Sequence, residues 1–159
     1  MNRQNVVAGV IAVILVAVAV GAILYSTKDS QVHLAGSLLR VRTHAVDTEN
    51  TVVLADVRIT NPTTQQFVVR DVQVFVDDLQ GDPFSETDAR RLFEYYPVLG
   101  QKYNSNLTVR QKINRGESID RMVTVSFKAT DDKIQKRKAL RIVITDVDGA
   151  KTEIVEKKS

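Results

Sequence analysis

The sequence predicts a mainly β protein, a β-sandwich of about seven strands with one short inserted helix, preceded by a single N-terminal transmembrane helix. Three observations lead to this prediction. Residues 6–25 form an apolar run without a charged side chain, residues 32–156 contain short segments of alternating apolar and polar residues, and turn-forming residues separate those segments. Alternation with a period of two indicates strands with one buried face, and short strands divided by turns are typical of sandwiches.

The apolar run from Val6 to Tyr25 has the length of a helix that spans a bilayer. Twenty residues at a rise of about 1.5 Å each cover roughly 30 Å, the thickness of the hydrocarbon core. A cleaved signal peptide is the alternative, because Arg3 precedes the run and Ala17-Val18-Ala19 fits a cleavage pattern. A signal peptide needs only about 7 to 15 apolar residues, so the length of the run favours an uncleaved signal anchor.

The chain is expected to comprise a tail (1–5), the transmembrane helix (6–25), a tether (26–31), the sandwich domain (32–156) and a C-terminal tail (157–159). A short tail before a first apolar helix favours an N-terminus in the cytoplasm. We therefore expect a single-pass protein of the inner or plasma membrane, with its domain extracytoplasmic and with residues 6–25 in contact with membrane lipid.

Composition narrows the possible partners and chemistry. The part after Tyr25 carries 21 basic and 19 acidic residues, a net charge of only +2, so nucleic acid is not an expected partner. The chain has no Cys, which excludes disulfides, a thiolate nucleophile and a Cys-containing zinc site. One core is expected, since about 130 residues suffice to bury it without disulfides or metals.

Seven segments with alternating apolar residues are the predicted strands. The first of them, Val32 to Arg42, is irregular, because Leu34 and Leu38 share one parity and Val41 takes the other; this predicts a bulge or a change of sheet. Turns are predicted at residues 61–64, 78–81, 114–117 and 146–149. The other six strands are centred on Val53–Ile59, Val72–Val76, Leu107–Val109, Val123–Phe127, Leu140–Ile144 and Thr152–Ile154.

One stretch, at about residues 85–97, has a helical pattern instead. Ser85 is a predicted N-cap, apolar residues follow on one helical face, and Pro97 ends the helix, which is expected over Glu86–Tyr96. The helix would be an insertion between strands that covers an end or an edge of the sandwich. A further helical turn around Asp131–Lys136 is too short to assign.

Two strands and their turns resemble a known module. Val57-Arg58-Ile59-Thr60-Asn61-Pro62-Thr63 is followed by Val72-Gln73-Val74-Phe75-Val76-Asp77-Asp78 and Gly81, and later by Asn114-Arg115-Gly116-Glu117. This pattern is similar to the immunoglobulin-like, telokin-like extracytoplasmic domains of unknown function behind bacterial membrane anchors, and more distantly to the late-embryogenesis-abundant type 2 domain. The resemblance implies an immunoglobulin-like sandwich with a binding or structural role and no active site to carry over.

No catalytic or metal-binding motif is present in the sequence. His33 and His44 lack ligand spacing, and acidic residues around 77–88 and 146–148 are explained by turns and helix capping, so we expect no catalytic residue, no metal and no cofactor. The aromatic and Arg-rich insertion is the candidate binding site, because Tyr and Arg favour binding hot spots, although core packing would explain its rings as well. The candidate binding residues are Arg90, Arg91, Tyr95, Tyr96 and Tyr103.

A second candidate is a basic patch formed by Lys133, Lys136, Arg137 and Lys138, which would meet anionic headgroups or an acidic partner unless it is merely a solvated loop. Taken together, the sequence predicts a non-catalytic, membrane-tethered, extracytoplasmic binding or assembly module whose insertion meets a protein partner in the cell envelope. The alternatives are a structural or stress-related domain without a specific ligand and a secreted domain released by signal-peptide cleavage. The oligomeric state is not predicted.

Overall fold

The computed structural model describes residues 33–101 and 104–156, together with Val16 and Val18. It divides into two compact units, residues 1–31 and residues 32–159. The predicted transmembrane helix at 6–25 lies outside the described residues apart from Val16 and Val18. Within the described part, no helix is long and apolar enough to cross a membrane.

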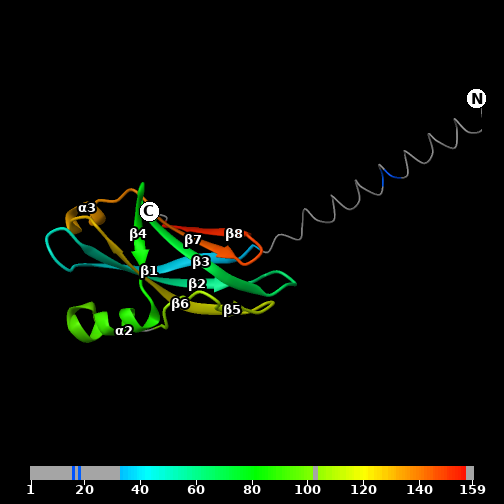
Figure 1. Cartoon of the computed structure of the whole chain (residues 1–159), viewed down its shortest axis with the longest axis horizontal. Helices are drawn as coiled ribbons and strands as arrows, with labels where there is room; N and C mark the ends of the chain where they lie inside the picture. Colours follow the sequence, from blue (N-terminus) through cyan, green and yellow to red (C-terminus); the bar gives the residue numbers. More distant parts are fainter. Residues whose placement is uncertain (1–15, 17, 19–32, 102–103, 157–159) are drawn as a thin grey trace, which may run out of the picture. The chain divides into compact units, whose positions relative to one another are not determined.

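The domain is a β-sandwich with a small helical complement (Figure 1). Its strand order is β1-β2-β6-β4-β3-β7-β8, and all the neighbouring strands along this path are antiparallel. The strands are β1 (Ala35–Ala45), β2 (Thr51–Thr60), β3 (Phe67–Val76), β4 (Leu79–Pro83), β5 (Lys112–Ile113), β6 (Ser118–Phe127), β7 (Leu140–Asp146) and β8 (Lys151–Val155). The helices are α2 (Glu86–Tyr95), the 3-10 turn η1 (Pro97–Leu99) and α3 (Asp131–Gln135).

The two layers of the sandwich are joined by strand β4. Leu79–Gly81 of β4 pair with β3, whereas Asp82 and Pro83 pair with β6. One layer therefore holds β1, β2 and β6, the other holds β3, β7 and β8, and β4 passes between them. The main core fills the space between the layers, and its largest side chains with almost no exposure include Phe67, Phe127, Ile113, Ile134, Leu140, Ile142, Ile144 and Ile154.

Strand β1 contains the predicted bulge. Leu38 pairs with Val57 and Arg40 pairs with Asp56, so Leu39 is an extra residue without a partner on β2. The bulge lets Leu38 and Val41 both pack against the main core although they lie three residues apart. The change of parity in the sequence is thereby explained.

Strand β2 differs from the half-buried strand expected from its alternation. Its residues from Thr51 to Val57 are all buried. Val53 and Ala55 face the main core, while Val52 and Leu54 belong to a second cluster beneath α2. The helix therefore covers the outer face of a sheet, and the expectation that the insertion would cover an end or an edge was wrong.

Two further sequence predictions were wrong in detail. Leu107–Val109 is not a strand: this segment forms only an isolated bridge at Asn106, and the left-handed backbone of Arg110 (φ 69°) prevents an extended continuation. The predicted turn at 78–81 is displaced, because the chain turns at Asp77 and Asp78 and residues 79–83 form β4. The predicted helix over Glu86–Tyr96 is confirmed, ending one residue earlier at Tyr95.

Candidate functional site

The candidate site is α2 with the segment that follows it, held against the outer face of β2 and β6. Ser85 caps the helix: its Oγ accepts a hydrogen bond from the Asp88 amide at 3.2 Å and donates to the Asp88 carboxylate at 2.6 Å. The first of these hydrogen bonds satisfies a backbone N–H that the first helical turn leaves without a partner inside the helix. The apolar face of the helix packs in the second cluster, which comprises Ala89, Leu92, Leu99, Val52, Leu54 and Met122.

An ion pair under the helix fixes the segment after α2. The Arg42 guanidinium lies 3.2 Å from Asp56 Oδ2 and donates to the carbonyls of Leu99 at 2.8 Å and Gln101 at 3.3 Å. It also lies over the Phe93 ring, 5.7 Å from its centroid. Both charged side chains are largely buried, with 13% and 7% of their surface exposed, so Arg42 connects β1, β2 and the end of the insertion in one network.

Asn106 holds the other end of the insertion. Its side chain donates to the Phe84 carbonyl at 2.7 Å and accepts from the Thr124 amide at 3.1 Å, while its own amide donates to Glu86 at 2.6 Å. The side chain is buried, with 4% of the residue exposed. Asn106-Leu107-Thr108 has the Asn-x-Thr pattern of an N-glycosylation site, but the Asn106 side-chain nitrogen is engaged inside the fold and is not available on the folded surface.

The predicted binding residues divide into two groups. Arg90, Arg91 and Tyr95 are exposed on the outer side of α2, and Tyr95 has 78% of its surface exposed. Tyr96 instead turns inward and meets His44 edge-on, with the ring centroids 5.1 Å apart. Tyr103 lies outside the described residues.

The outer side of α2 is extended by Val98 of η1, which has 75% of its surface exposed. In a helix, residues four apart lie on the same side, which places Arg91 and Tyr95 together. Within the described part of the chain, Arg90, Arg91 and Tyr95 have no ion pair and no ring contact. This surface offers exposed Arg, Tyr and Val side chains of the kinds used in recognition, together with the exposed Glu94, which lies four residues after Arg90.

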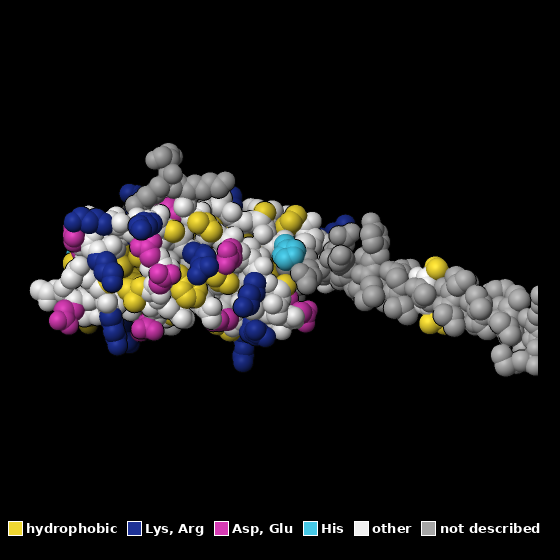
Figure 2. Space-filling model, turned by 90° about the horizontal axis from the view of Figure 1, so that it is seen from above, with side chains coloured by type: hydrophobic (Ala, Val, Ile, Leu, Met, Phe, Trp, Pro, Cys, Tyr) yellow, Lys and Arg dark blue, Asp and Glu magenta, His cyan; other side chains and the backbone are white. Residues whose placement is uncertain are grey.

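The four residues of the predicted basic patch do not form one exposed surface. Lys133, Lys136 and Lys138 are exposed, and Lys136 pairs with Asp132 at 2.8 Å. Arg137 does not belong to an exposed patch, because its guanidinium is buried and binds both carboxylate oxygens of Glu156 at 2.7 and 2.8 Å. On the face drawn in Figure 2, basic and acidic side chains are interleaved and do not form one positive area.

The acidic residues of the turns have structural partners. Asp77 Oδ1 accepts hydrogen bonds from the amides of Lys138 and Ala139 at 3.0 Å each, and Asp146 accepts from the amides of Val68 and Asp148. His33 is exposed, and His44 lies against Tyr96. Among residues 33–101 and 104–156, no three His, Asp or Glu residues are grouped in a way that could hold a metal ion.

Sequence reasoning missed the ion pair of Arg42 and Asp56. The available signal was the placement of Asp56 within an otherwise apolar strand, because a charged residue at a buried position needs a partner. Its partner could not be chosen from sequence alone, since that choice depends on the register between β1 and β2 across the bulge.

Solved structures that are similar to this chain include two β-proteins. A FixG-related protein from Vibrio parahaemolyticus has 14% sequence identity and a TM-score of 0.42, with 77% of this chain and 92% of that chain covered. An uncharacterized beta-sandwich protein from Clostridium difficile 630 has 11% identity and a TM-score of 0.37, with 78% and 85% covered. Neither a protein-family model nor a curated protein sequence matches the chain.

Proposed function

We propose that this chain is a non-catalytic, membrane-tethered binding or assembly module, and that the outer side of α2 docks on a protein partner in the cell envelope. Residues 6–25 would be an uncleaved signal anchor of the inner or plasma membrane, with the N-terminus in the cytoplasm and the sandwich outside it. The length of the apolar run supports this placement.

The observation that carries the proposal is the exposed face formed by Arg90, Arg91, Tyr95 and Val98 on a rigidly held helix. Tyr and Arg are the residue types that binding hot spots favour, and here an aromatic ring with 78% exposure lies on the same short helix as two exposed guanidiniums. The helix is fixed by its cap, by the second cluster and by the Arg42 network. A surface fixed in advance loses less entropy on binding.

We further propose that the domain has an immunoglobulin-like fold and that, among such domains, it resembles the telokin-like group. The strand order supports this proposal. In immunoglobulin domains the first, second and fifth strands share one sheet, and the third, sixth and seventh share the other. Here β1, β2 and β6 correspond to the first set and β3, β7 and β8 to the second, with β4 as the crossing strand between them. The late-embryogenesis-abundant type 2 domain stays a more distant resemblance.

An alanine set tests the docking proposal. The full chain with Arg90, Arg91 and Tyr95 replaced by Ala is compared with the wild type by chemical crosslinking in intact membranes followed by mass spectrometry. The matched control replaces Arg70 on β3 together with Arg115 and Val147 in turns, which are exposed residues outside α2 and η1.

Loss of one defined crosslinked protein in the first set, with its retention in the control set, is the expected result. Equal crosslinking in both sets would overturn the docking surface, provided that both variants keep the thermal midpoint of the wild type. The absence of any crosslinked protein in the wild type would favour the structural or stress-related alternative.

A further inference from the structure

The second notable surface is the open seam between β1 and β8, the two edge strands of the sandwich. Each of them is hydrogen-bonded to a strand on one side only, β1 to β2 and β8 to β7. No backbone hydrogen bond joins β1 to β8 among the described residues. An edge strand of this kind presents unpaired N–H and C=O groups that can pair with a further strand.

The seam is closed at one end and open beyond it. At the closed end, the Leu34 amide donates to Thr152 Oγ1 at 3.0 Å, and Gly36 lies so close to Ile154 that an added Cβ would be 2.3 Å from its Cγ1. Past Gly36 the strands leave a groove of about 420 Å³. This volume lies within the range of about 300 to 1,000 Å³ that is usual for ligand sites.

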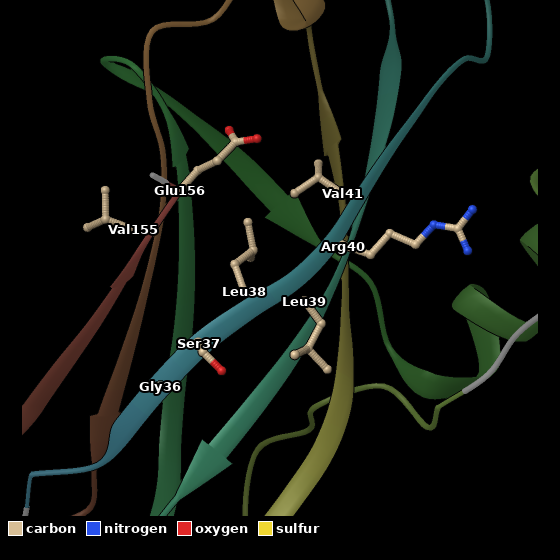
Figure 3. A pocket seen from close by; sticks show the side chains of 8 residues that line it. All are labelled: Gly36, Ser37, Leu38, Leu39, Arg40, Val41, Val155 and Glu156. Carbon is tan, nitrogen blue, oxygen red and sulfur yellow. The ribbon is translucent and has the colours of Figure 1, made fainter. Parts of the chain in front are cut away.

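The walls of the groove combine apolar side chains with edge backbone (Figure 3). Leu38 and Val41 of β1 are partly buried and pack against the main core from inside the seam. Leu39 and Val155 are exposed hydrophobic residues on the two strands, with 48% and 46% of their surface exposed. A strand added beside β1 would place its inward side chains next to Leu38 and Val41, because neighbouring strands share their faces.

The charged residues that line the groove favour particular residue types on the outward face of such a strand. Two charged residues line the groove, Arg40 and Glu156. Glu156 is neutralised by the bidentate contact with Arg137. Arg40 is exposed and makes no ion pair in the described part of the chain, and in Figure 3 its side chain projects away from Val155 and Glu156, on the outer side of β1. Cross-strand neighbours share a face of the sheet, so an acidic residue placed opposite Arg40 on the added strand would lie on the same outer face, where the long Arg40 side chain can turn toward it.

We propose that the seam binds an extended peptide segment, which adds a strand to the free edge of β1, inserts apolar side chains toward Leu38 and Val41, and places a carboxylate beside Arg40. This is strand addition, in which backbone hydrogen bonds provide the affinity and alternate side chains provide the selection. The surface is separate from α2, so this inference does not depend on the docking proposal.

Three synthetic peptides test the inference against the full chain in lipid nanodiscs. The acidic peptide is Thr-Val-Glu-Val-Thr-Val-Thr, a second peptide carries Lys in place of Glu, and a third carries Pro at the central Val to remove an N–H. Because the chain has no Cys, Val155→Cys accepts a single environment-sensitive fluorophore at the rim of the groove. Hydrogen exchange of residues 37–41 reports strand pairing independently of the label.

The acidic peptide is expected to bind about three- to tenfold more tightly than the Lys peptide, and to slow exchange at residues 37–41, because an opposite-charge pair replaces a like-charge pair across the strands. The Pro peptide is expected to lose binding. Arg40→Glu should reverse the preference between Glu and Lys, whereas the control Arg70→Glu on β3 should leave it unchanged.

Three results would overturn the inference. One is the absence of any slowing of exchange in β1 with the acidic peptide at millimolar concentration. Another is a charge preference that Arg40→Glu does not alter although the variant keeps the wild-type thermal midpoint. The third is slowed exchange at residues 37–41 that grows with protein concentration without peptide, which would assign the edge to a second copy of this chain.

Discussion

Gly81 lies in β4 opposite Val74 of β3, one residue before β4 begins to pair with β6, and its role is steric. An added Cβ would lie 2.3 Å from Val125 Cγ1 and 2.8 Å from the Phe127 ring. From the sequence, Gly81 reads as a turn glycine, whereas the structure places it in a strand that must approach another sheet closely. The crossing of β4 between the layers thus depends on the missing side chain.

Gly81→Ala is expected to destabilise the domain by about 1–3 kcal/mol, because the extra methyl group must displace buried side chains. Equilibrium unfolding in urea measures the change. Gly116→Ala is the informative comparison: no atom lies within 4 Å of its added Cβ, and its cost would arise only from the positive φ of 70°. A Gly81→Ala domain as stable as the wild type would show that β4 does not approach β6 so closely.

Asp120 forms a bidentate ion pair with Arg58 on the exposed face of β2 and β6, at 2.7 and 2.8 Å. The hydrogen bonds from Arg58 hold the pKa of the Asp120 carboxyl below its ordinary value of 3.8. A lowered folded-state pKa means that the pair contributes its stability at pH values above the ordinary Asp value. The contribution is lost as the pH falls through the lowered pKa.

Carboxyl carbon shifts followed by NMR between neutral pH and acid should show Asp120 titrating below an ordinary Asp. Arg58→Gln should return the pKa of Asp120 toward 3.8. A titration of Asp120 that is the same with and without the Arg58 guanidinium would contradict the pairing.

Helix α2 and the 3-10 turn η1 carry the proposed docking surface, and Arg42 connects them to the sheet. The Arg42–Asp56 pair is largely buried, whereas the Arg58–Asp120 pair is exposed, with 54% and 36% of the two side chains accessible. Removing one partner of a buried pair leaves the other charge buried and unpaired, which lowers the free energy of unfolding by about 3–5 kcal/mol. An exposed pair contributes little to stability, because both charges stay largely solvated.

Arg42→Ala should therefore destabilise the domain several times more than Arg58→Ala in urea unfolding. It should also speed exchange of the Leu99 and Gly100 amides, which bond to Tyr96 and Pro97, because the carbonyls of Leu99 and Gln101 lose the donor that anchors this segment. The double variant Arg42→Ala with Asp56→Ala should cost less than the sum of the single changes, because neither charge is then left alone. Equal costs for Arg42→Ala and Arg58→Ala would mean that α2 is held by apolar packing alone.

At this scale the sequence is informative about elements with strong local signals. The alternation of β2, β6 and β7, the cap at Ser85 and the parity change at Leu38 and Val41 all predict features that the structure has. The strand β4 could not be predicted, because its five residues carry a Gly and a Pro and its pairing is entirely nonlocal. The position of α2 could not be predicted either. Val52 and Leu54 lie on a second face of β2, and that face is buried only because the helix packs on it.

For the candidate site, the exposed residues were easier to predict than the buried ones. Arg90, Arg91 and Tyr95 stand out by composition and by helical spacing. Tyr96 has the same composition, yet the helix turns it toward His44. Arg137 resembles its lysine neighbours in the sequence, and only the contact between the end of α3 and the end of β8 shows that Glu156 neutralises it.

For the whole domain, the two ends differ in what they contain. The described chain enters at His33, beside the closed end of the seam, and β1 then extends for 11 residues, or about 35 Å, toward the turn at 46–50. Thr130 and Lys133, at the start of α3, share a surface hollow with Glu49 and Asn50 of that turn. The exposed Lys133 thus lies at the end of the domain opposite His33.

The central claim is that the domain, held at the membrane, meets a protein partner through the outer side of α2. A photoreactive phenylalanine analogue placed at Tyr95 in the full chain, and irradiated in intact membranes, tests it most directly. The matched position is Val147, which is exposed on the turn between β7 and β8 with 50% of its surface accessible. We expect one dominant crosslinked protein from Tyr95, and no crosslinked product of that mass from Val147. The same products from both positions, or none from Tyr95 while the labelled chain is present in the membrane fraction, would contradict it.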